Sequence, residues 1–320
     1  MSNRLLGISA PPLRLITSAL LTISFASLWC PAQTSLMRVI DDSDPAEALT
    51  GLSSHVESEI GVVIDEVPSP RLVHFAPEAT QTNSGAVIVI PGGGYAVEAY
   101  DLEGVHIARE LAAAGYNAFV LQYRLPVHTD EMGTKSHDDA SYVPLADAQS
   151  AVRRARALAD SLGYAANKIA VMGFSAGGHL AGSVAVHEVP TPLTTYSSRP
   201  DRSILVYAVT KMDEEASGHR GSQDNLLGPT SSNATREYFD LPGRVDANTP
   251  PTLLVHASDD EIVPVDNAIA YYRALLAAGV LADLRVYATG GHGFGTARER
   301  DAPLNIWLDE ALTWLRSSGW

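Results

Sequence analysis

The chain has 320 residues, of which 46% are hydrophobic and 18% are charged, so it holds enough apolar material to bury the core of a large domain. Its net charge of −15 argues against the basic surface that nucleic-acid phosphates require, and nucleic acid is therefore not an expected partner. Its single cysteine, Cys30, excludes an intramolecular disulfide and a four-cysteine zinc site.

The first thirty residues differ in composition from the rest of the chain. Arg4 and Arg14 are the only charges among them, and the apolar stretch "LITSALLTISFASLW" (15–29) follows. This stretch is about as long as the apolar region of a signal peptide and too short to remain as a membrane-spanning helix. The pattern predicts a secretory signal peptide, and therefore a secreted or periplasmic protein without a stable membrane anchor.

The predicted signal peptide covers residues 1–32, with cleavage expected near Ala26 or Ala32. Two alternatives stay open, namely an uncleaved N-terminal helix or anchor and a lipid attached to Cys30. Residues 33–60 are acidic and have no clear period, so they are expected to form a leader into the fold.

The folded part is expected to begin with two strands, "GVVIDEV" (61–67) and "RLVHFAP" (71–77), joined like a hairpin by a Pro-Ser-Pro turn. Apolar strands then alternate with amphipathic helices. Continuous apolar strands indicate burial on both faces, so residues 61–320 are predicted to form a single α/β domain with a mostly parallel central sheet and helices on both faces. Strands are predicted over 86–90, 117–125, 168–174, 203–209, 252–258 and 284–289, and helices over 102–115, 144–163, the segment after Ser175, 265–279 and 303–319.

Residues 210–249 interrupt this alternation. They are polar, rich in glycine and serine, and without a clear core pattern. A stretch of this length between strands is usually functional, so it is expected to be a cap-like or long-loop insertion that helps to shape a site.

The stretch "GFSAG" (173–177) fits the pattern Gly-x-Ser-x-Gly and stands where a predicted strand meets a predicted helix. The two glycines leave room for a tight crossing of strand and helix, and the hydroxyl of Ser175 then stands above the sheet. The amide of Ala176, at the start of the helix, can face an anionic oxygen. The pattern predicts Ser175 as a nucleophile, and the alternative is a glycine-rich helix entry that serves packing alone.

A serine hydroxyl needs a base. His292 stands among glycines in "ATGGHGFG" (288–295), directly after a predicted strand, and is the predicted base. The other nine histidines are scattered without the short spacing of metal ligands, so no metal or cofactor is expected and a zinc site is a lesser alternative. His179, four residues after Ser175, is expected to pack or hydrogen-bond beneath the turn.

The base in turn needs an acid that orients it. Asp259 and Asp260 follow a predicted strand, and the arrangement Asp-x-x-Val-Pro favours Asp260, with Asp259 as the second choice. The resulting order Ser175, Asp260, His292 is the order found in the α/β-hydrolase fold.

The stretch "VIVIPGGGYA" (87–96) ends a buried strand in three glycines. Because glycine lets the main chain approach a ligand closely, the N–H groups of Gly93 and Gly94 are expected to join Ala176 in an oxyanion hole. A plain glycine loop is the alternative.

The motifs "PGGGY", "LQYRLP", "MGFSAGGHLAG", "NLLG" and "GGHGFG" resemble those of the bacterial α/β-hydrolase esterases, in particular the acetyl-esterase, acetylxylan-esterase and feruloyl-esterase-like group. The resemblance covers about residues 60–318. It implies the same triad and the same oxyanion donors, and it makes Tyr95 a candidate wall of the acyl pocket, with loop packing as the alternative. Pro91 stands where hormone-sensitive-lipase-like relatives carry histidine, which points toward the sugar-esterase branch.

The resemblance implies a serine carboxylesterase that removes small acyl groups, acetyl above all, from xylan-derived or other carbohydrates without a cofactor. An acetylated oligosaccharide is thus the expected partner. A prolyl-oligopeptidase-like peptidase and a non-catalytic carbohydrate-binding protein on the same fold are the alternatives. The absence of a propeller-sized N-terminal domain argues against the first, and the intact triad argues against the second.

Overall fold

The computed structural model describes most of the chain from Arg38 onward. The predicted signal peptide, with both expected cleavage sites and Cys30, lies outside the described residues. The described residues are 38–41, 49, 54–77, 85–128, 137–192, 194–212, 218–228, 231–317 and 319–320.

An eight-stranded sheet forms the centre of the molecule, with the strand order β1-β4-β6-β5-β7-β8-β9-β10. All neighbouring strands run parallel except β4 and β6, so the predicted mostly parallel sheet is confirmed. A separate antiparallel pair joins β2 to β3. The strands are β1 (Arg38–Asp41), β2 (Ser54–Ser58), β3 (Gly61–Glu66), β4 (Arg71–Phe75), β5 (Ala86–Ile90), β6 (Asn117–Gln122), β7 (Ile169–Phe174), β8 (Arg202–Val206), β9 (Thr252–Ala257) and β10 (Ala282–Tyr287).

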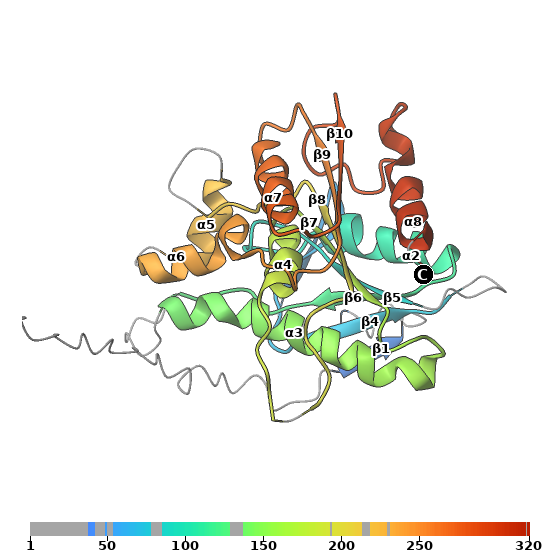
Figure 1. Ribbon diagram of the computed structural model, residues 1–320. Coiled ribbons are helices and arrows are strands. Elements are labelled where there is room, and N and C mark those ends of the chain that lie inside the picture. The colour runs from blue at the N-terminus through green and yellow to red at the C-terminus, as the bar shows by residue number, and fades with distance from the viewer. Residues whose placement is uncertain are drawn as a thin grey trace, which may run out of the picture.

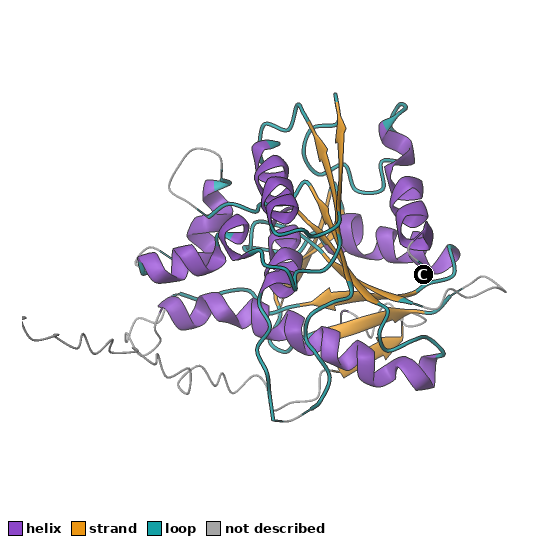
Figure 2. Ribbon diagram, viewed as in Figure 1, coloured by secondary structure: helices purple, strands orange, loops and turns teal. Residues whose placement is uncertain are grey.

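Helices cover both faces of this sheet, as predicted (Figures 1 and 2). Helices α3, α4 and α7 lie over one face, and α2 and α8 lie over the other. The helices are η3 (Tyr100–Val105), α2 (His106–Ala113), α3 (His137–Leu162), α4 (Ser175–Val186), α5 (Arg220–Leu227), α6 (Asn233–Phe239), η4 (Leu241–Arg244), α7 (Asp266–Ala277), η5 (Leu304–Ile306) and α8 (Trp307–Ser317).

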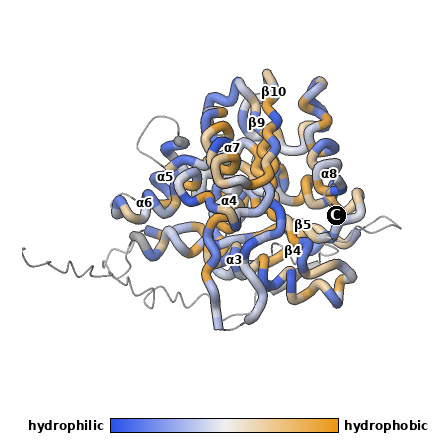
Figure 3. Tube along the Cα trace, in the orientation of Figure 1, coloured by the Kyte–Doolittle hydropathy of each residue, from blue (hydrophilic) through white to orange (hydrophobic). Residues whose placement is uncertain are grey.

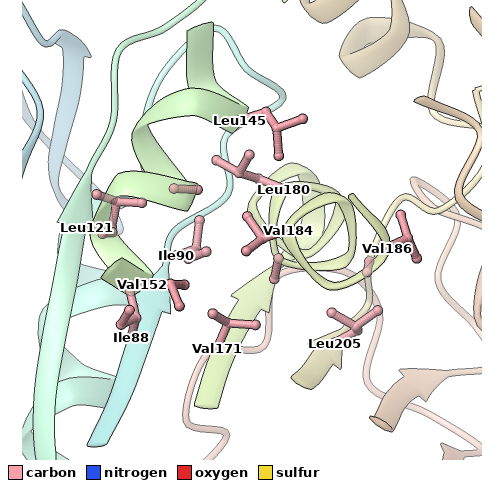
Figure 4. Packing of buried hydrophobic residues seen from close by; sticks show 14 of the residues in the cluster. Ile88, Ile90, Leu121, Leu145, Val152, Val171, Leu180, Val184, Val186 and Leu205 are labelled. Carbon is pink, nitrogen blue, oxygen red and sulfur yellow. The ribbon is translucent and has the colours of Figure 1, made fainter. Parts of the chain in front are cut away.

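Each face of the sheet has its own hydrophobic core, because successive side chains of a strand point to opposite faces. In β5, Ile88 belongs to the core under α3 and α4, whereas Val87 belongs to the core under α2 and α8. Figure 4 shows Leu180 of α4 among the strand residues Ile90 and Val171. The central strands carry much of the hydrophobic sequence, which Figure 3 colours orange.

The register of the parallel strands places the loops that carry the predicted site at one edge of the sheet. Ile90 of β5 pairs with Gly173 of β7, and Phe174 pairs with Val206 of β8. The three strands therefore end at nearly the same level. The glycine loop after β5, the turn after β7 and the loop after β8 must meet there.

The start of the fold differs from the prediction. The expected hairpin between 61–67 and 71–77 is wrong, because β3 pairs with β2, and β4 pairs with β1 and β6. The chain reverses one strand earlier, before Gly61, whose φ of +88° is a conformation that glycine adopts without strain. The intervening Pro-Ser-Pro segment cannot continue a strand ladder, since proline has no N–H to donate. Strands β1 and β2 thus lie inside the stretch 33–60, where the acidic composition indicated only a leader.

Helix α3 begins earlier than predicted, at His137 rather than at residue 144. Proline is favoured in the first turn of a helix, which is why Pro144 indicated a helix start. The structure instead places Pro144 inside the helix.

The segment 210–249 has more internal order than its composition indicated. Its described part contains α5, α6 and η4. Leu226, Leu227, Phe239 and Leu241 are buried and belong to the core under α3 and α4. The segment therefore folds onto the body of the domain.

Candidate active site

Ser175 occupies the turn between β7 and α4. Its φ is +51°, a left-handed value that is rare for residues other than glycine, and the residue is only 6% exposed. A backbone constrained in this way is common at functional sites. The predicted strand, turn and helix are all present around this serine.

The small residues around Ser175 are required by the close crossing of α4 over the sheet. A Cβ atom on Gly173 would lie 2.2 Å from the carbonyl oxygen of Gly177. A Cβ on Gly177 would lie 2.2 Å from the carbonyl oxygen of Ile90, and one on Gly178 would lie 2.5 Å from the Cβ of Ala208. Because these neighbours are mostly backbone atoms, they cannot move aside without shifting α4 or the strands beneath it.

The structure brings Ser175, His292 and Asp260 into one hydrogen-bonded chain. The Nε2 atom of His292 lies 2.9 Å from the Ser175 Oγ, and its Nδ1 atom lies 2.7 Å from the Asp260 Oδ2. An ionised Asp260 accepts from Nδ1–H, so Nε2 is left free to accept the serine proton. Three loops, after β7, β9 and β10, supply the three side chains.

Asp260 is held as a carboxylate by donors on several sides. Its Oδ1 accepts from the backbone N–H groups of Ile262 at 3.0 Å and Val263 at 2.8 Å. Its Oδ2 also lies 3.4 Å from the Nε2 of the buried His256. Burial alone would raise the pKa of Asp260, but the hydrogen bonds from His256, His292 and Val263 outweigh burial and hold the pKa below its usual range.

The neighbouring Asp259, which was the second choice for the acid, has a different place. Its Oδ1 accepts from the backbone N–H of Gly291 at 2.8 Å, and the residue is exposed. It therefore contacts the loop of His292 but not the imidazole, and the geometry favours Asp260 over Asp259.

The glycine loop after β5 comes into direct contact with Ser175. A Cβ on Gly92 would lie 2.8 Å from the Ser175 Cβ. The N–H of Gly92 donates to Glu103, whereas no hydrogen bond in the described part of the chain takes the N–H of Gly93 or Gly94. The N–H of Ala176, in the first turn of α4, has no partner within the helix. These three amides are the predicted oxyanion donors, and they remain available for that role.

Tyr95, the predicted wall of the acyl pocket, lies beneath this loop and is 2% exposed. Its hydroxyl lies 2.7 Å from the Nδ1 of His179, whose Nε2 lies 2.8 Å from the carbonyl oxygen of Phe239. Nε2–H therefore donates to Phe239, and Nδ1 accepts from Tyr95. The predicted place of His179 beneath the turn is confirmed, while contact of Tyr95 with a substrate stays a prediction.

Helix α5 contacts the glycine loop that follows β5. The side-chain amide of Asn225 donates to the carbonyl oxygen of Gly94 at 2.9 Å. The ring of His219 lies close by, with its Cε1 3.9 Å from the position of a Cβ on Gly94. The Nδ1 of His219 accepts from the backbone N–H of Ser222 at 3.2 Å, so its proton is on Nε2. Burial and then the charge of His292 lower the pKa of His219.

The BD-FAE family model matches residues 73–275, more than half of the chain. The chain belongs to the BD-FAE family. The matched region includes the turn of Ser175 and the loop of Asp260, and it ends before His292.

Relatives of this BD-FAE chain include a protein named as an acetylxylan esterase and one named as a xylanase. An acetylxylan esterase from Xylanibacter ruminicola is 34% identical over 238 residues, which cover 70% of this chain and 44% of that protein. Endo-1,4-beta-xylanase B from Butyrivibrio fibrisolvens is 35% identical over 218 residues, which cover 67% of this chain and 33% of that protein. The BD-FAE chain thus spans less than half the length of these two relatives.

A solved structure extends the comparison from the sequence to the three-dimensional fold. The acetyl ester-xyloside bifunctional hydrolase from Caldicellulosiruptor lactoaceticus is 33% identical and superposes with a TM-score of 0.70, covering 79% of this chain and 90% of that one. The predicted α/β-hydrolase fold and the resemblance to its bacterial esterase group are confirmed.

Several residues near the BD-FAE site were not singled out from the sequence. His219 and Asn225 lie in the polar segment 210–249, where no periodic pattern marked them. His256 lies within the apolar strand β9, and its contact with Asp260 depends on the turn at the strand end. No group of metal-ligating side chains occurs among the described residues, and none of the helices described could span a membrane.

The buried His179 makes the stability of this domain dependent on pH. Burial lowers the pKa of His179 from its usual 6.5 to about 4, so the folded protein keeps it neutral at neutral pH. The unfolded chain binds more protons between these two values, so stability is full above pH 6.5 and is lost as pH falls toward 4. A shift of this size corresponds to about 2 kcal/mol between pH 7 and pH 5.

The substitution His179→Gln tests this expectation, because glutamine can still accept from Tyr95 and donate to Phe239 but does not titrate. The advantage of the wild type over the variant in free energy of unfolding should decrease by about 2 kcal/mol from pH 7 to pH 5. Urea denaturation at the two pH values measures it. An advantage that stays constant would contradict a neutral buried histidine.

Proposed function

We propose that this BD-FAE chain is a serine carboxylesterase that hydrolyses small acyl esters, acetyl esters above all, on xylan-derived or other carbohydrates. The observation that carries the proposal is the hydrogen-bonded chain from Ser175 through His292 to Asp260, next to the loop of Gly93 and Gly94. Such a chain supplies a nucleophile, a base and an orienting acid, and the loop supplies donors for an oxyanion.

The reaction proceeds in two acyl transfers. The Oγ of Ser175 forms a bond to the ester carbonyl carbon while its proton passes to the Nε2 of His292. The N–H groups of Gly93, Gly94 and Ala176 stabilise the negative charge that develops on the carbonyl oxygen. The bond to the alcohol then breaks, and His292 returns the proton to the departing alkoxide oxygen.

Water completes the cycle by attacking the acyl-serine. His292 removes a proton from the water as it bonds to the acyl carbon, and then donates that proton to Ser175 Oγ as the acid leaves. Asp260 stays ionised throughout and stabilises the imidazolium that forms twice in each turnover. No redox step and no external co-reactant other than water is needed.

The substrate class is supported by the names of the relatives and by the chemistry around the loop. One relative is named for acetylxylan and a solved structure for acetyl esters and xylosides. The ring of the half-buried His219 lies near Gly94 and carries its proton on Nε2, from which it can donate to a hydroxyl oxygen of a sugar. The alcohol part of a simple alkyl ester has no further hydroxyl group, so it offers no such oxygen to His219.

We further propose that the chain is exported, as the apolar segment in residues 15–29 predicts. Polymeric xylan and its large fragments cannot cross a membrane unaided, so an exported enzyme would meet them outside the cytoplasm. Sequencing the N-terminus of the protein recovered from the secreted or periplasmic fraction tests this part.

The deciding experiment measures acetate released from acetylated xylo-oligosaccharides, alongside p-nitrophenyl acetate and p-nitrophenyl butyrate. The Ser175→Ala variant is the control for contaminating activity. Release of acetate from the sugar that depends on Ser175, with acetate preferred to butyrate, supports the proposal. Cleavage of the artificial esters alone would leave an esterase and remove the carbohydrate substrate.

A further inference from the structure

A second buried carboxylate, Glu103, lies beside the predicted site and has no part in the triad. It belongs to η3, a π-helix of six residues that follows the glycine loop, and it is 4% exposed. Burying a carboxylate is costly unless its oxygens are hydrogen-bonded. Short π-helices frequently occur at functional sites. The hydrogen bonds of Glu103 therefore indicate the role of this buried carboxylate.

Both oxygens of Glu103 accept hydrogen bonds from different loops. Oε2 accepts from the backbone N–H of Gly92 at 2.8 Å, and Oε1 accepts from the hydroxyl of Tyr207 at 3.0 Å. Burial raises the pKa of Glu103, while these two bonds and the nearby His292 act in the opposite direction. Two donors facing two oxygens fit the ionised carboxylate.

The first of these bonds holds the start of the glycine loop. Gly92 lies against Ser175, since a Cβ on it would be 2.8 Å from the serine Cβ. With its own N–H directed to Glu103, Gly92 cannot donate to an oxyanion. The bond holds the peptide immediately before the N–H groups of Gly93 and Gly94. It acts together with the bonds from Ala99 to the Gly92 carbonyl and from Ala96 and Val97 to the Gly93 carbonyl, which hold the peptides that carry those groups.

The second bond leads to the loop of His292. The hydroxyl of Tyr207 also accepts from the backbone N–H of Gly295 at 3.3 Å. The Tyr207 ring meets the His292 ring edge to face at 4.9 Å between centroids, and the Phe294 ring at 4.5 Å. One carboxylate thus connects the glycine loop, the residue after β8 and the loop that carries the histidine.

We propose that Glu103 is a positioning residue that holds the glycine loop, with the predicted oxyanion donors Gly93 and Gly94, and the loop of His292 in a fixed relation on either side of Ser175. It contacts neither the substrate nor the reacting atoms. As a result, a single conformation of the protein positions both the amides of Gly93 and Gly94 and the Nε2 of His292 for the reaction. This inference rests on the proposed esterase function and adds a residue that neither the sequence motifs nor the triad includes.

The test compares Glu103→Gln with a matched control, Glu98→Gln. Glu98 is also buried and lies five residues earlier, and it also accepts from a backbone N–H, that of Tyr123 at 2.6 Å. With p-nitrophenyl acetate, Glu103→Gln should lower kcat by about 10- to 100-fold, since loss of a whole oxyanion donor costs 10²- to 10³-fold, and should leave KM within about two-fold. Glu98→Gln should keep kcat within about three-fold of the wild type.

The substitution Tyr207→Phe removes the hydroxyl that joins Glu103 to the histidine loop, and it provides a second readout. It should also lower kcat at nearly constant KM. The double variant should lose less than the product of the two single losses, because residues of one network are not additive. If Glu103→Gln does not fold, the Tyr207→Phe variant tests the proposal by itself. A kcat of Tyr207→Phe equal to that of the wild type would overturn the proposal.

Three results separate the possible failures. A kcat of Glu103→Gln equal to the wild type would overturn the positioning role while leaving the esterase intact. Equal losses in Glu103→Gln and Glu98→Gln would also overturn it, because any buried carboxylate would then have the same effect. A wild type whose hydrolysis does not exceed that of Ser175→Ala would overturn the proposed function itself.

Discussion

Replacing Ser175 by alanine is expected to lower kcat for p-nitrophenyl acetate by about 10⁴-fold or more. The substitution removes the only atom that can form the acyl intermediate, and it leaves the amides of Gly93 and Gly94 to stabilise a much slower attack by water. The loss should be the same for acetylated xylo-oligosaccharides, because both substrates use the same intermediate. Initial rates with purified wild type and variant measure it.

The same substitution should leave the fold nearly unchanged. Alanine is smaller than serine, and both carry a Cβ, so the backbone at φ +51° is equally constrained in the two proteins. We expect a shift in Tm of no more than a few degrees. An alanine variant that melts like the wild type and keeps full activity would show that another group attacks the ester.

The second large effect is expected for Asp260→Asn, which should lower kcat by about 10⁴-fold. An asparagine can donate from its amide N–H₂ to the Nδ1 of His292. The neutral imidazole then carries its proton on Nε2, which faces Ser175 and can no longer accept the serine proton. The imidazolium that forms in each step also loses its neighbouring negative charge. Stopped-time assays at pH 7 to 8 with the same ester measure the loss.

Asp259→Asn is the matched control, since it changes the adjacent residue in the same way. Asparagine keeps an oxygen that can accept from the N–H of Gly291, so we expect kcat within about three-fold of the wild type. If the two variants lost activity equally, Asp259 and Asp260 would share the role that the geometry gives to Asp260.

The meeting of Ser175, Asp260 and His292 could be predicted because each of these residues follows a local rule at a strand end. Small residues surround Ser175 since the close crossing of α4 over the sheet leaves no room for a Cβ, and this constraint is visible in a few consecutive letters. His292 stands among glycines directly after a strand. Asp260 had a competitor in Asp259, and only the fold shows which of the two reaches the imidazole.

What could not be predicted depends on contacts between distant segments. Glu103 looks like an ordinary acidic residue on an amphipathic helix, and its partners Gly92 and Tyr207 are 11 and 104 residues away. The edge strand β1 has only four residues and pairs with a strand more than thirty positions later, so no period marks it. The central strands, in contrast, are buried on both faces and show continuous apolar runs.

The bond from Asn225 to the carbonyl of Gly94 has a consequence for anyone who wishes to alter the enzyme by directed evolution. Because Asn225 of α5 donates to the carbonyl oxygen of Gly94, a library that randomises Asn225 is expected to change turnover of every ester together, whereas one that randomises His219 is expected to change the preference among esters. Asn225 is also tied by its own carbonyl to the Nε2 of His128 at 2.8 Å. A segment grafted from a relative would therefore need to bring compatible partners for both Gly94 and His128 to remain productive.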